Sequence, residues 1–284
     1  MAEIDRRVFL LGTVGLSATL LAPQSVVSAR SMPTALVYAG PASTADSTLC
    51  WKPITALLKT SYKVIEVGPA SRPRVALTPH LLERATLYVQ PGGGDDLLGA
   101  WNEMKKYRTP LTNYVKHGGH YLGICMGAYL AAGENTKGNP GLGLIRPGDT
   151  NEYVGPSLVS DDPRNSEADE VVALSWGGKA RTMYFQAGPE FTAQELRSTN
   201  VIATYSNGQS AAMVVPLGKG SIGLSGPHPE APSDWYSASG PDFLKYEGNP
   251  PRPFPTSDLF HDLVMQTVQM RGGQNVQYGG GHAG

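Results

Sequence analysis

The stretch from His120 to Leu130 constrains the fold most, because it requires a buried strand that turns directly into a helix. Its first half is apolar and aromatic, which favours a buried parallel strand, and Met126–Ala132 consists mostly of good helix formers. Cys125 stands between the two halves, with a glycine two positions away on either side. A nucleophile on a sharp, strained strand-to-helix turn needs such small neighbours, and a helix N-terminus favours a thiolate. An inert buried cysteine in an ordinary turn fits the same pattern equally well.

Two distant segments favour the catalytic interpretation. A glycine-rich loop at Gly92–Gly94 follows a strand-like apolar run, and bare N–H groups in such a loop can stabilise an oxyanion. Far downstream, His228 and Glu230 are two residues apart in an extended segment, so both side chains project to the same side and can meet. A cysteine nucleophile, a histidine base and an orienting carboxylate form a hydrolytic triad. We therefore predict that Cys125, His228 and Glu230 are catalytic.

In this order, the motifs resemble those of the class I glutamine amidotransferase superfamily. The resemblance is closest to the domain at the N-terminus of some biotin–protein ligases, which also occurs alone in bacterial proteins. It extends from about Thr34 to about Tyr236, and its motifs are specific only as a set. The matching motifs are Tyr38-Ala39-Gly40-Pro41, Pro91-Gly92-Gly93, Tyr121-Leu122-Gly123-Ile124-Cys125-Met126-Gly127-Ala128-Tyr129 and Gly226-Pro227-His228-Pro229-Glu230.

The resemblance implies the same three catalytic residues and adds an oxyanion hole. Its N–H groups would come from Met126 and from one of Gly92, Gly93 and Gly94. One position departs from the family pattern. Members that use glutamine commonly carry a glutamine four residues after the nucleophile, and this chain carries Tyr129 there. Hydrolytic machinery is compatible with that change, but the change argues against glutamine as the substrate.

These observations predict a cysteine hydrolase that cleaves a carboxamide or peptide-like C–N bond through a thioester. Its partner would be a small-molecule or peptide amide, and no cofactor is expected. A catalytically inactive binding or scaffold domain with the same fold is an alternative, and a cysteine peptidase, which would use the same atoms, is another. Aromatic residues with a few polar groups suit a substrate pocket, although core or rim positions explain them equally well. The candidates are Tyr129, Tyr184, Gln186, Glu190 and Trp235.

Composition argues against several other classes of function. The formal net charge of -1 and the pI near 6.6 offer no electrostatic basis for binding nucleic acid or an anionic membrane. The two cysteines cannot form a disulfide framework, and Cys50 is predicted to be a small core residue. His117 and His120 have a spacing that a metal site could use, but a glycine turn explains them better, so no metal is predicted.

The N-terminal residues 1–29 have the features of an export signal. Arg6-Arg7 matches a twin-arginine signal, and a short apolar run with small residues at its end follows. The run is too short for a comfortable membrane-spanning helix, although an uncleaved anchor is an alternative. We expect export by the twin-arginine route to the periplasm or medium, with no stable membrane insertion after cleavage. The oligomeric state is left open.

Residues 30–272 are predicted to form the amidotransferase-like domain, followed by a disordered glycine-rich tail at 273–284. Strand-like and helix-like segments alternate in the first half, which predicts an α/β fold of the flavodoxin-like, doubly wound type with a mostly parallel sheet. Antiparallel strands are expected to extend it in the C-terminal half. The expected strands are 34–39, 62–67, 86–89, 142–145, 170–176, 179–186, 201–206, 210–216 and 221–224. The expected helices are 44–59, 81–85, two pieces within 97–115 that Thr109-Pro110 separates, and one that starts at Thr256 or Ser257 and ends at Gly272-Gly273.

Overall fold

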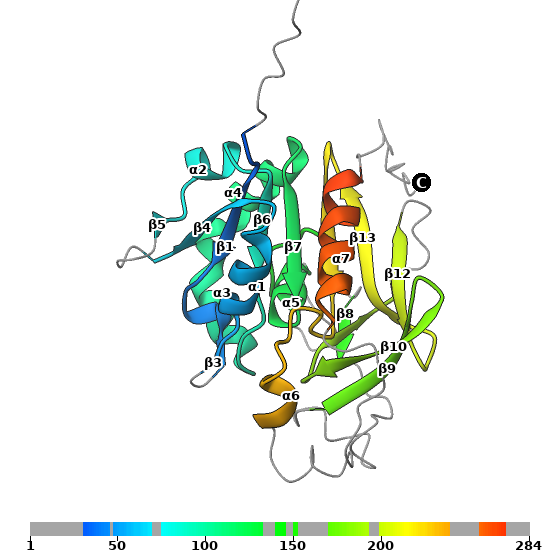
Figure 1. Ribbon diagram of the computed structural model, residues 1–284. Coiled ribbons are helices and arrows are strands. Elements are labelled where there is room, and N and C mark those ends of the chain that lie inside the picture. The colour runs from blue at the N-terminus through cyan, green and yellow to red at the C-terminus, as the bar shows by residue number, and fades with distance from the viewer. Residues whose placement is uncertain are drawn as a thin grey trace, which may run out of the picture. The chain divides into compact units, whose positions relative to one another are not determined.

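Short apolar runs at regular intervals form the parallel centre of the sheet in a computed structural model of the protein (Figure 1). In chain order these strands are β1 (Thr34–Tyr38), β4 (Lys63–Gly68), β6 (Leu87–Gln90), β7 (His120–Ile124) and β14 (Gly220–Ser225). They lie in the spatial order β4-β1-β6-β7-β14, and every neighbouring pair is parallel. Numbered along the chain, that order is 2-1-3-4-5, the flavodoxin-like arrangement.

The structure describes residues 31–45, 48–69, 75–132, 140–145, 150–152, 170–192, 199–238 and 256–270. The chain divides into two units, Met1–Ser31 and Met32–Gly284, and the elements below all belong to the second. The predicted export signal at 1–29 and the predicted tail at 273–284 lie outside the described residues. Among the helices of the described ranges, none is long and apolar enough to cross a membrane.

Antiparallel strands extend the sheet beyond β14, as predicted. The order continues through β13 (Ser210–Leu217), β12 (Asn200–Tyr205), β9 (Glu170–Trp176) and β10 (Lys179–Phe185). A tight turn joins β13 to β14, and Gly218 adopts a φ of 61° there, a left-handed conformation that glycine reaches without strain. The smaller strands are β5 (Val75–Ala76) beside β4, β11 (Pro189–Phe191) beside β13, and β8 (Thr150–Glu152) beside β11. The predicted fold class is confirmed.

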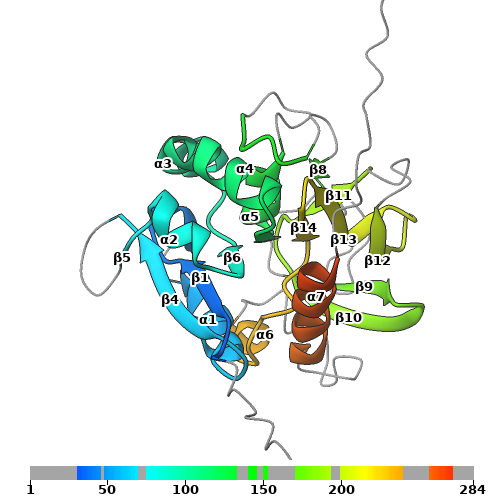
Figure 2. The same ribbon diagram turned by 90° about the horizontal axis from the view of Figure 1, so that it is seen from above.

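Helices cover both faces of the parallel strands (Figure 2). On one face, α2 (Pro79–Glu83), α3 (Leu97–Met104), α4 (Arg108–Lys116) and α5 (Met126–Ala131) pack with Leu36 and Tyr38 of β1. On the other face, α1 (Trp51–Leu58) and α7 (Ser257–Gln269) pack with Ala35 and Val37 of the same strand. Successive residues of β1 therefore enter opposite cores, which is why its sequence is apolar throughout.

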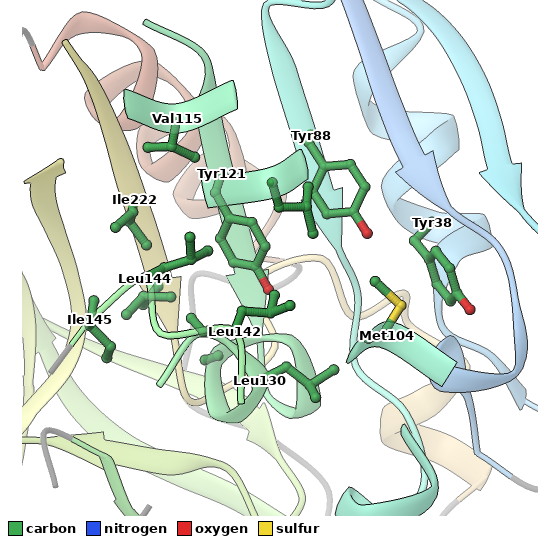
Figure 3. Close-up of a cluster of buried hydrophobic side chains, with 14 of the residues drawn as sticks. Tyr38, Tyr88, Met104, Val115, Tyr121, Leu130, Leu142, Leu144, Ile145 and Ile222 are labelled. Carbon is green, nitrogen blue, oxygen red and sulfur yellow. The ribbon is translucent and has the colours of Figure 1, made fainter. Parts of the chain in front are cut away.

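Buried tyrosines distinguish the core under α3, α4 and α5 (Figure 3). The rings of Tyr88 and Tyr121 lie 5.7 Å apart, and burial raises the pKa of both phenols well above 10. Each hydroxyl has an internal acceptor: Tyr88 donates to Gln90 Oε1 at 2.7 Å, and Tyr121 donates to the carbonyl of Gly127 at 2.7 Å. These bonds offset the cost of burying the hydroxyls and attach the sheet to the first turn of α5.

Several predicted elements differ from those observed, two of them in the N-terminal half. The helix expected over 44–59 begins only at Trp51. This start places Pro53 in the first turn, where the N–H that proline lacks would have no helical acceptor. Before the helix, Thr44–Ala45 (β2) and Thr48–Leu49 (β3) form a small antiparallel ribbon. The segment 97–115 does split, but at the 3₁₀ turn Lys105–Tyr107 (η2), so that Pro110 lies in the first turn of α4.

The remaining differences concern the C-terminal half. Ile145 makes an isolated parallel bridge with Ala132, and no strand forms within the described residues 140–145. The last helix, α7, ends at Gln269, before the glycines expected to stop it. Thr256 is the residue before α7, as predicted, but its hydroxyl does not cap the helix. It donates to the carbonyl of Pro229 at 3.1 Å, so it ties α7 to the segment that carries His228 and Glu230.

Candidate active site

Cys125 occupies the predicted turn between β7 and α5. Its backbone is in a strained conformation, with φ 50° and ψ -111°, and its own N–H is paired with the carbonyl of Ser225 at 2.8 Å. Close chain approaches explain the flanking glycines: a methyl group on Gly123 would lie 2.5 Å from the carbonyl oxygen of Gly127. Only 7% of Cys125 is exposed. The turn thus fixes the position of the Cys125 sulfur at the carboxyl edge of the sheet, where ligands bind in open α/β folds.

His228 and Glu230 follow β14 and meet as the sequence predicts. Nδ1 of His228 lies 2.9 Å from Oε1 of Glu230, and both side chains are buried. The backbone N–H of His228 donates to the carbonyl of Tyr184 at 2.9 Å, which attaches the imidazole segment to β10. Oε2 of Glu230 is buried and has no hydrogen-bond partner within the described part of the chain. The carboxylate is therefore held by the imidazole through one oxygen.

Cys125 lies beside the same imidazole. Burial alone would lower the pKa of His228, but the charge of Glu230, the charge of Cys125 and hydrogen bonds to both residues outweigh burial and raise it to about 10. Because Nδ1 is occupied by Glu230, Nε2 is the ring nitrogen left for the sulfur. Gly92 lies beside both residues: a methyl group there would come within 2.8 Å of His228 Cε1 and 3.6 Å of Cys125 Cβ. The structure therefore brings all three predicted residues together.

The glycine loop lies next to the nucleophile, but its three N–H groups are not equivalent. The N–H of Gly94 donates to the carbonyl of Thr44 at 3.2 Å, so it is committed to the fold. Gly93 is adjacent to Met126, since a methyl group on Gly93 would lie 3.3 Å from Met126 Cγ. In the residues that the structure describes, the N–H groups of Gly93 and Met126 have no backbone acceptor. The same holds for the N–H of Gly92, so Gly92, Gly93 and Met126 are the candidates left to donate to an oxyanion.

Aromatic side chains surround the imidazole. The ring centroids of Tyr184 and Trp235 lie 5.6 Å and 5.5 Å from that of His228. The hydroxyl of Tyr236 accepts a hydrogen bond from the backbone N–H of Tyr184 at 2.9 Å and also bonds to Thr256. Burial raises the pKa of Tyr236 to about 12, so the phenol stays neutral. Sequence analysis did not single out Tyr236, because its partners are far away along the chain and no spacing relates them.

Tyr129 and Gln186 meet at a turn that lies over the sulfur. The thiol of Cys125 donates to the backbone carbonyl of Gln186 at 3.4 Å, and the hydroxyl of Tyr129 donates to the carbonyl of Ala187 at 3.1 Å. Ala187 adopts a φ of 47°, a left-handed conformation that is unusual for a residue with a side chain. Glu190, another predicted pocket residue, accepts from Asn207 Nδ2 at 2.7 Å instead.

The two histidines that could have suggested a metal site have separate structural partners. Nδ1 of His117 lies 2.7 Å from the carbonyl of Asn113, and Nδ1 of His120 lies 2.8 Å from the hydroxyl of Ser221. Over the described ranges, no group of three or more histidine, cysteine or acidic side chains could hold a metal ion. His117 directly follows α4 at the glycine turn, whereas His120 is the first residue of β7.

Comparison with known proteins bears directly on the predicted resemblance. Residues 34–143 match the family model described as "Biotin-protein ligase, N terminal". The predicted resemblance to the biotin–protein ligase N-terminal domain is confirmed over this part of the chain. A biotin–protein ligase from Schizosaccharomyces pombe is 30% identical over 176 residues, which cover 56% of this chain and 27% of that protein. The chain thus spans about a quarter of the length of this curated biotin–protein ligase.

Two solved structures are similar to the chain at low sequence identity. A crystal structure of a glutamine amidotransferase is similar with a TM-score of 0.49 and 17% identity, over 75% of this chain and 97% of that one. A putative GMP synthase protein from Thermoplasma acidophilum is similar with a TM-score of 0.46 and 14% identity, over 83% of this chain and 98% of that one.

Proposed function

We propose that the protein is a cysteine hydrolase that cleaves a carboxamide or peptide-like C–N bond, with Cys125 as nucleophile, His228 as acid and base, and Glu230 as the group that orients His228. The observation that carries the proposal is the buried pair of His228 Nδ1 and Glu230 Oε1 at 2.9 Å, with Cys125 beside the imidazole. A carboxylate on Nδ1 fixes the ring so that Nε2 faces the sulfur. The raised pKa of His228 keeps the imidazole protonated at neutral pH, as a partner for a thiolate.

The proposed reaction has two halves. In the first, the Cys125 thiolate forms a bond to the carbonyl carbon, and the N–H groups of Gly93 and Met126 stabilise the oxyanion. The imidazolium of His228 gives its proton to the leaving nitrogen, the C–N bond breaks, and a thioester and a free amine result. In the second, neutral His228 takes a proton from water, the hydroxide attacks the thioester, and the carboxylic acid leaves the regenerated sulfur.

Alkylation of the folded protein with iodoacetamide, followed by peptide mass analysis, tests the nucleophile. Cys125 should react at least about tenfold faster than Cys50, which is 3% exposed and serves as a reference within the same molecule. The excess rate should disappear in His228→Ala. Equal rates for both cysteines, unchanged by that substitution, would remove the basis for a catalytic thiol.

Turnover needs its own measurement. Release of amine from a panel of small carboxamides and short peptide amides should stop in Cys125→Ser, because the less acidic hydroxyl lacks an adequate base. Retention of full hydrolysis in that variant would contradict the assignment. Cleavage of internal peptide bonds, rather than terminal carboxamides, would identify the enzyme as a cysteine peptidase.

A binding or scaffold domain is the second candidate. The observation that favours it is the engagement of Tyr129 with the chain's own Ala187 carbonyl at 3.1 Å, at the position where glutamine-using relatives carry a substrate-binding glutamine. A protein of this kind would keep the buried Cys125–His228 contact as a remnant of the fold. Absence of turnover over the whole amide panel, together with an unreactive Cys125, would favour it over the hydrolase.

Export by the twin-arginine route is part of the proposal and rests on the sequence of residues 1–29. Fusion of these residues to a reporter should carry the folded reporter across the membrane of a bacterial host. Arg6→Lys combined with Arg7→Lys should abolish transport, since the route recognises the paired arginines. Transport that survives this double substitution would rule out the twin-arginine assignment.

A further inference from the structure

The turn Gln186–Gly188, between β10 and β11, covers the sulfur of the proposed nucleophile. Its first carbonyl, that of Gln186, accepts a hydrogen bond from the Cys125 thiol at 3.4 Å. This bond engages the S–H group of the residue that must attack, so it has to break before the sulfur can react. In this conformation the thiol faces the chain's own backbone, which matches its low exposure of 7%.

Three contacts hold the turn in place. The Tyr129 hydroxyl donates to the Ala187 carbonyl at 3.1 Å, from one helical turn beyond the nucleophile. Gly188 packs against the backbone of Gly226, where a methyl group would clash with the carbonyl oxygen. The thiol itself makes the third contact. Tyr129 lies in α5, and Cys125 directly precedes that helix. The position of the turn Gln186–Gly188 over the sulfur therefore depends on α5.

Strain opposes these contacts. Ala187 has a φ of 47°, a conformation in which its Cβ crowds the backbone. Strain at a single non-glycine residue persists only where the surroundings enforce it, and it concentrates in segments that switch between conformations. The covered state is therefore a balance between these contacts, the Tyr129 bond among them, and the cost of the left-handed alanine.

We propose that Gln186–Gly188 is a cover that silences Cys125 until it is displaced, and that Tyr129 is the latch that keeps it closed. This inference rests on the proposed function, because a cover has meaning only over a nucleophile that reacts. It also gives a role to the departure from the glutamine-using pattern: the tyrosine binds the cover rather than the substrate. Substrate binding must then supply the free energy that opens the turn.

Two substitutions with opposite effects test the cover, with the rate of Cys125 alkylation by iodoacetamide as the readout. Tyr129→Phe removes the latch hydroxyl and should raise the rate about fivefold. Ala187→Gly relieves the strain in the closed turn and should lower the rate about threefold. Tyr107→Phe, a matched substitution in the turn before α4, should leave the rate unchanged. Cys50 reports on general loosening of the structure and should stay slow in every variant.

The outcomes separate the cover from the proposed function. If the rate depends on His228 but Tyr129→Phe leaves it unchanged or lowers it, the nucleophile stands and the cover is wrong. If Ala187→Gly accelerates alkylation, strain does not oppose the closed state and the cover is equally wrong. If Cys125 reacts no faster than Cys50 in any variant, including Tyr129→Phe, the catalytic thiol itself is refuted and the cover with it. The expected result is a faster alkylation of Cys125 in Tyr129→Phe and a slower one in Ala187→Gly. Both changes should disappear when the substitution is combined with His228→Ala.

Discussion

At the scale of single residues, the arrangement around Cys125 depends on a position where no side chain fits. Gly92 faces the gap between the sulfur and the imidazole, and a methyl group there would come within 2.8 Å of His228 Cε1. The imidazole is buried and held by Glu230, so it cannot make room for a methyl group without shifting from its observed position. Glycine is therefore needed at residue 92 so that Cys125 and His228 can lie side by side, in addition to any need for glycine in the loop itself.

Gly92→Ala is therefore expected to separate the thiol from its base while leaving the sheet intact. A displacement of about 1 Å in a reacting group costs roughly a hundredfold in rate, so Cys125 alkylation should fall by one to two orders of magnitude. Gly68→Ala is the control, since a methyl group there has its nearest neighbour at an ordinary 3.4 Å. Unchanged reactivity in folded Gly92→Ala would mean that the base does not act from the observed position.

At the scale of secondary-structure elements, α7 supports the site through its first residues. The Thr256 hydroxyl donates to the carbonyl of Pro229, between His228 and Glu230, and Thr256 also bonds to Tyr236. The middle of the helix lies tight on β14, because Gly223 leaves no room for a methyl group beside Thr267. α7 thereby fixes both the strand before the histidine and the segment that carries it.

Thr256→Val should lower the free energy of unfolding by about 1–2 kcal/mol, since the buried Pro229 carbonyl loses its donor and the Tyr236 hydroxyl loses a partner. Urea denaturation followed by circular dichroism measures the change. Ser257→Ala is the matched control, because no partner for that hydroxyl is found among the described residues. An equal fall in the free energy of unfolding in both variants would show that α7 is stabilised only by the packing of its buried apolar side chains.

The sequence predicts the local parts of this site well and the long-range parts poorly. The Cys125 turn and the His228–Glu230 pair are readable because each depends on neighbours within a few residues. The commitment of the Gly94 N–H to Thr44 is not readable, because it depends on a ribbon that forms where the sequence favours a helix. The contact of Gln186 with the thiol cannot be predicted either, because it is made by the backbone carbonyl, which every residue type carries.

At the scale of the whole molecule, strand order explains why distant segments share one site. β6, β7 and β14 are neighbours in the sheet, and the glycine loop, Cys125 and the His228 segment follow their carboxyl ends. The antiparallel strands then bring β10 back, so that the backbone of Tyr184 pairs with that of His228. The site therefore forms only when both halves of the sheet are complete. For this reason the protonation of its residues affects the free energy of unfolding of the whole domain.

That coupling predicts how stability depends on pH. The folded state raises the pKa of His228 from 6.5 to about 10, so the folded protein keeps a proton that the unfolded chain releases above 6.5. The stabilisation from this proton is fully present below pH 6.5 and is lost as pH rises to about 10, with a slope of at most about 1.4 kcal/mol per pH unit. The buried tyrosines act in the same direction, but only above their unfolded pKa of 10.

The free energy of unfolding of the wild-type protein, measured by urea denaturation between pH 6 and pH 10, should therefore fall across this window. In His228→Gln the proton is absent, so the curve over the same window should be flatter, while the steeper decline above pH 10 should remain in both proteins. Parallel curves below pH 10 would mean that folding does not raise the pKa of His228. The imidazole would then be neutral at physiological pH, and the sulfur would lack the cationic partner on which the proposed attack depends.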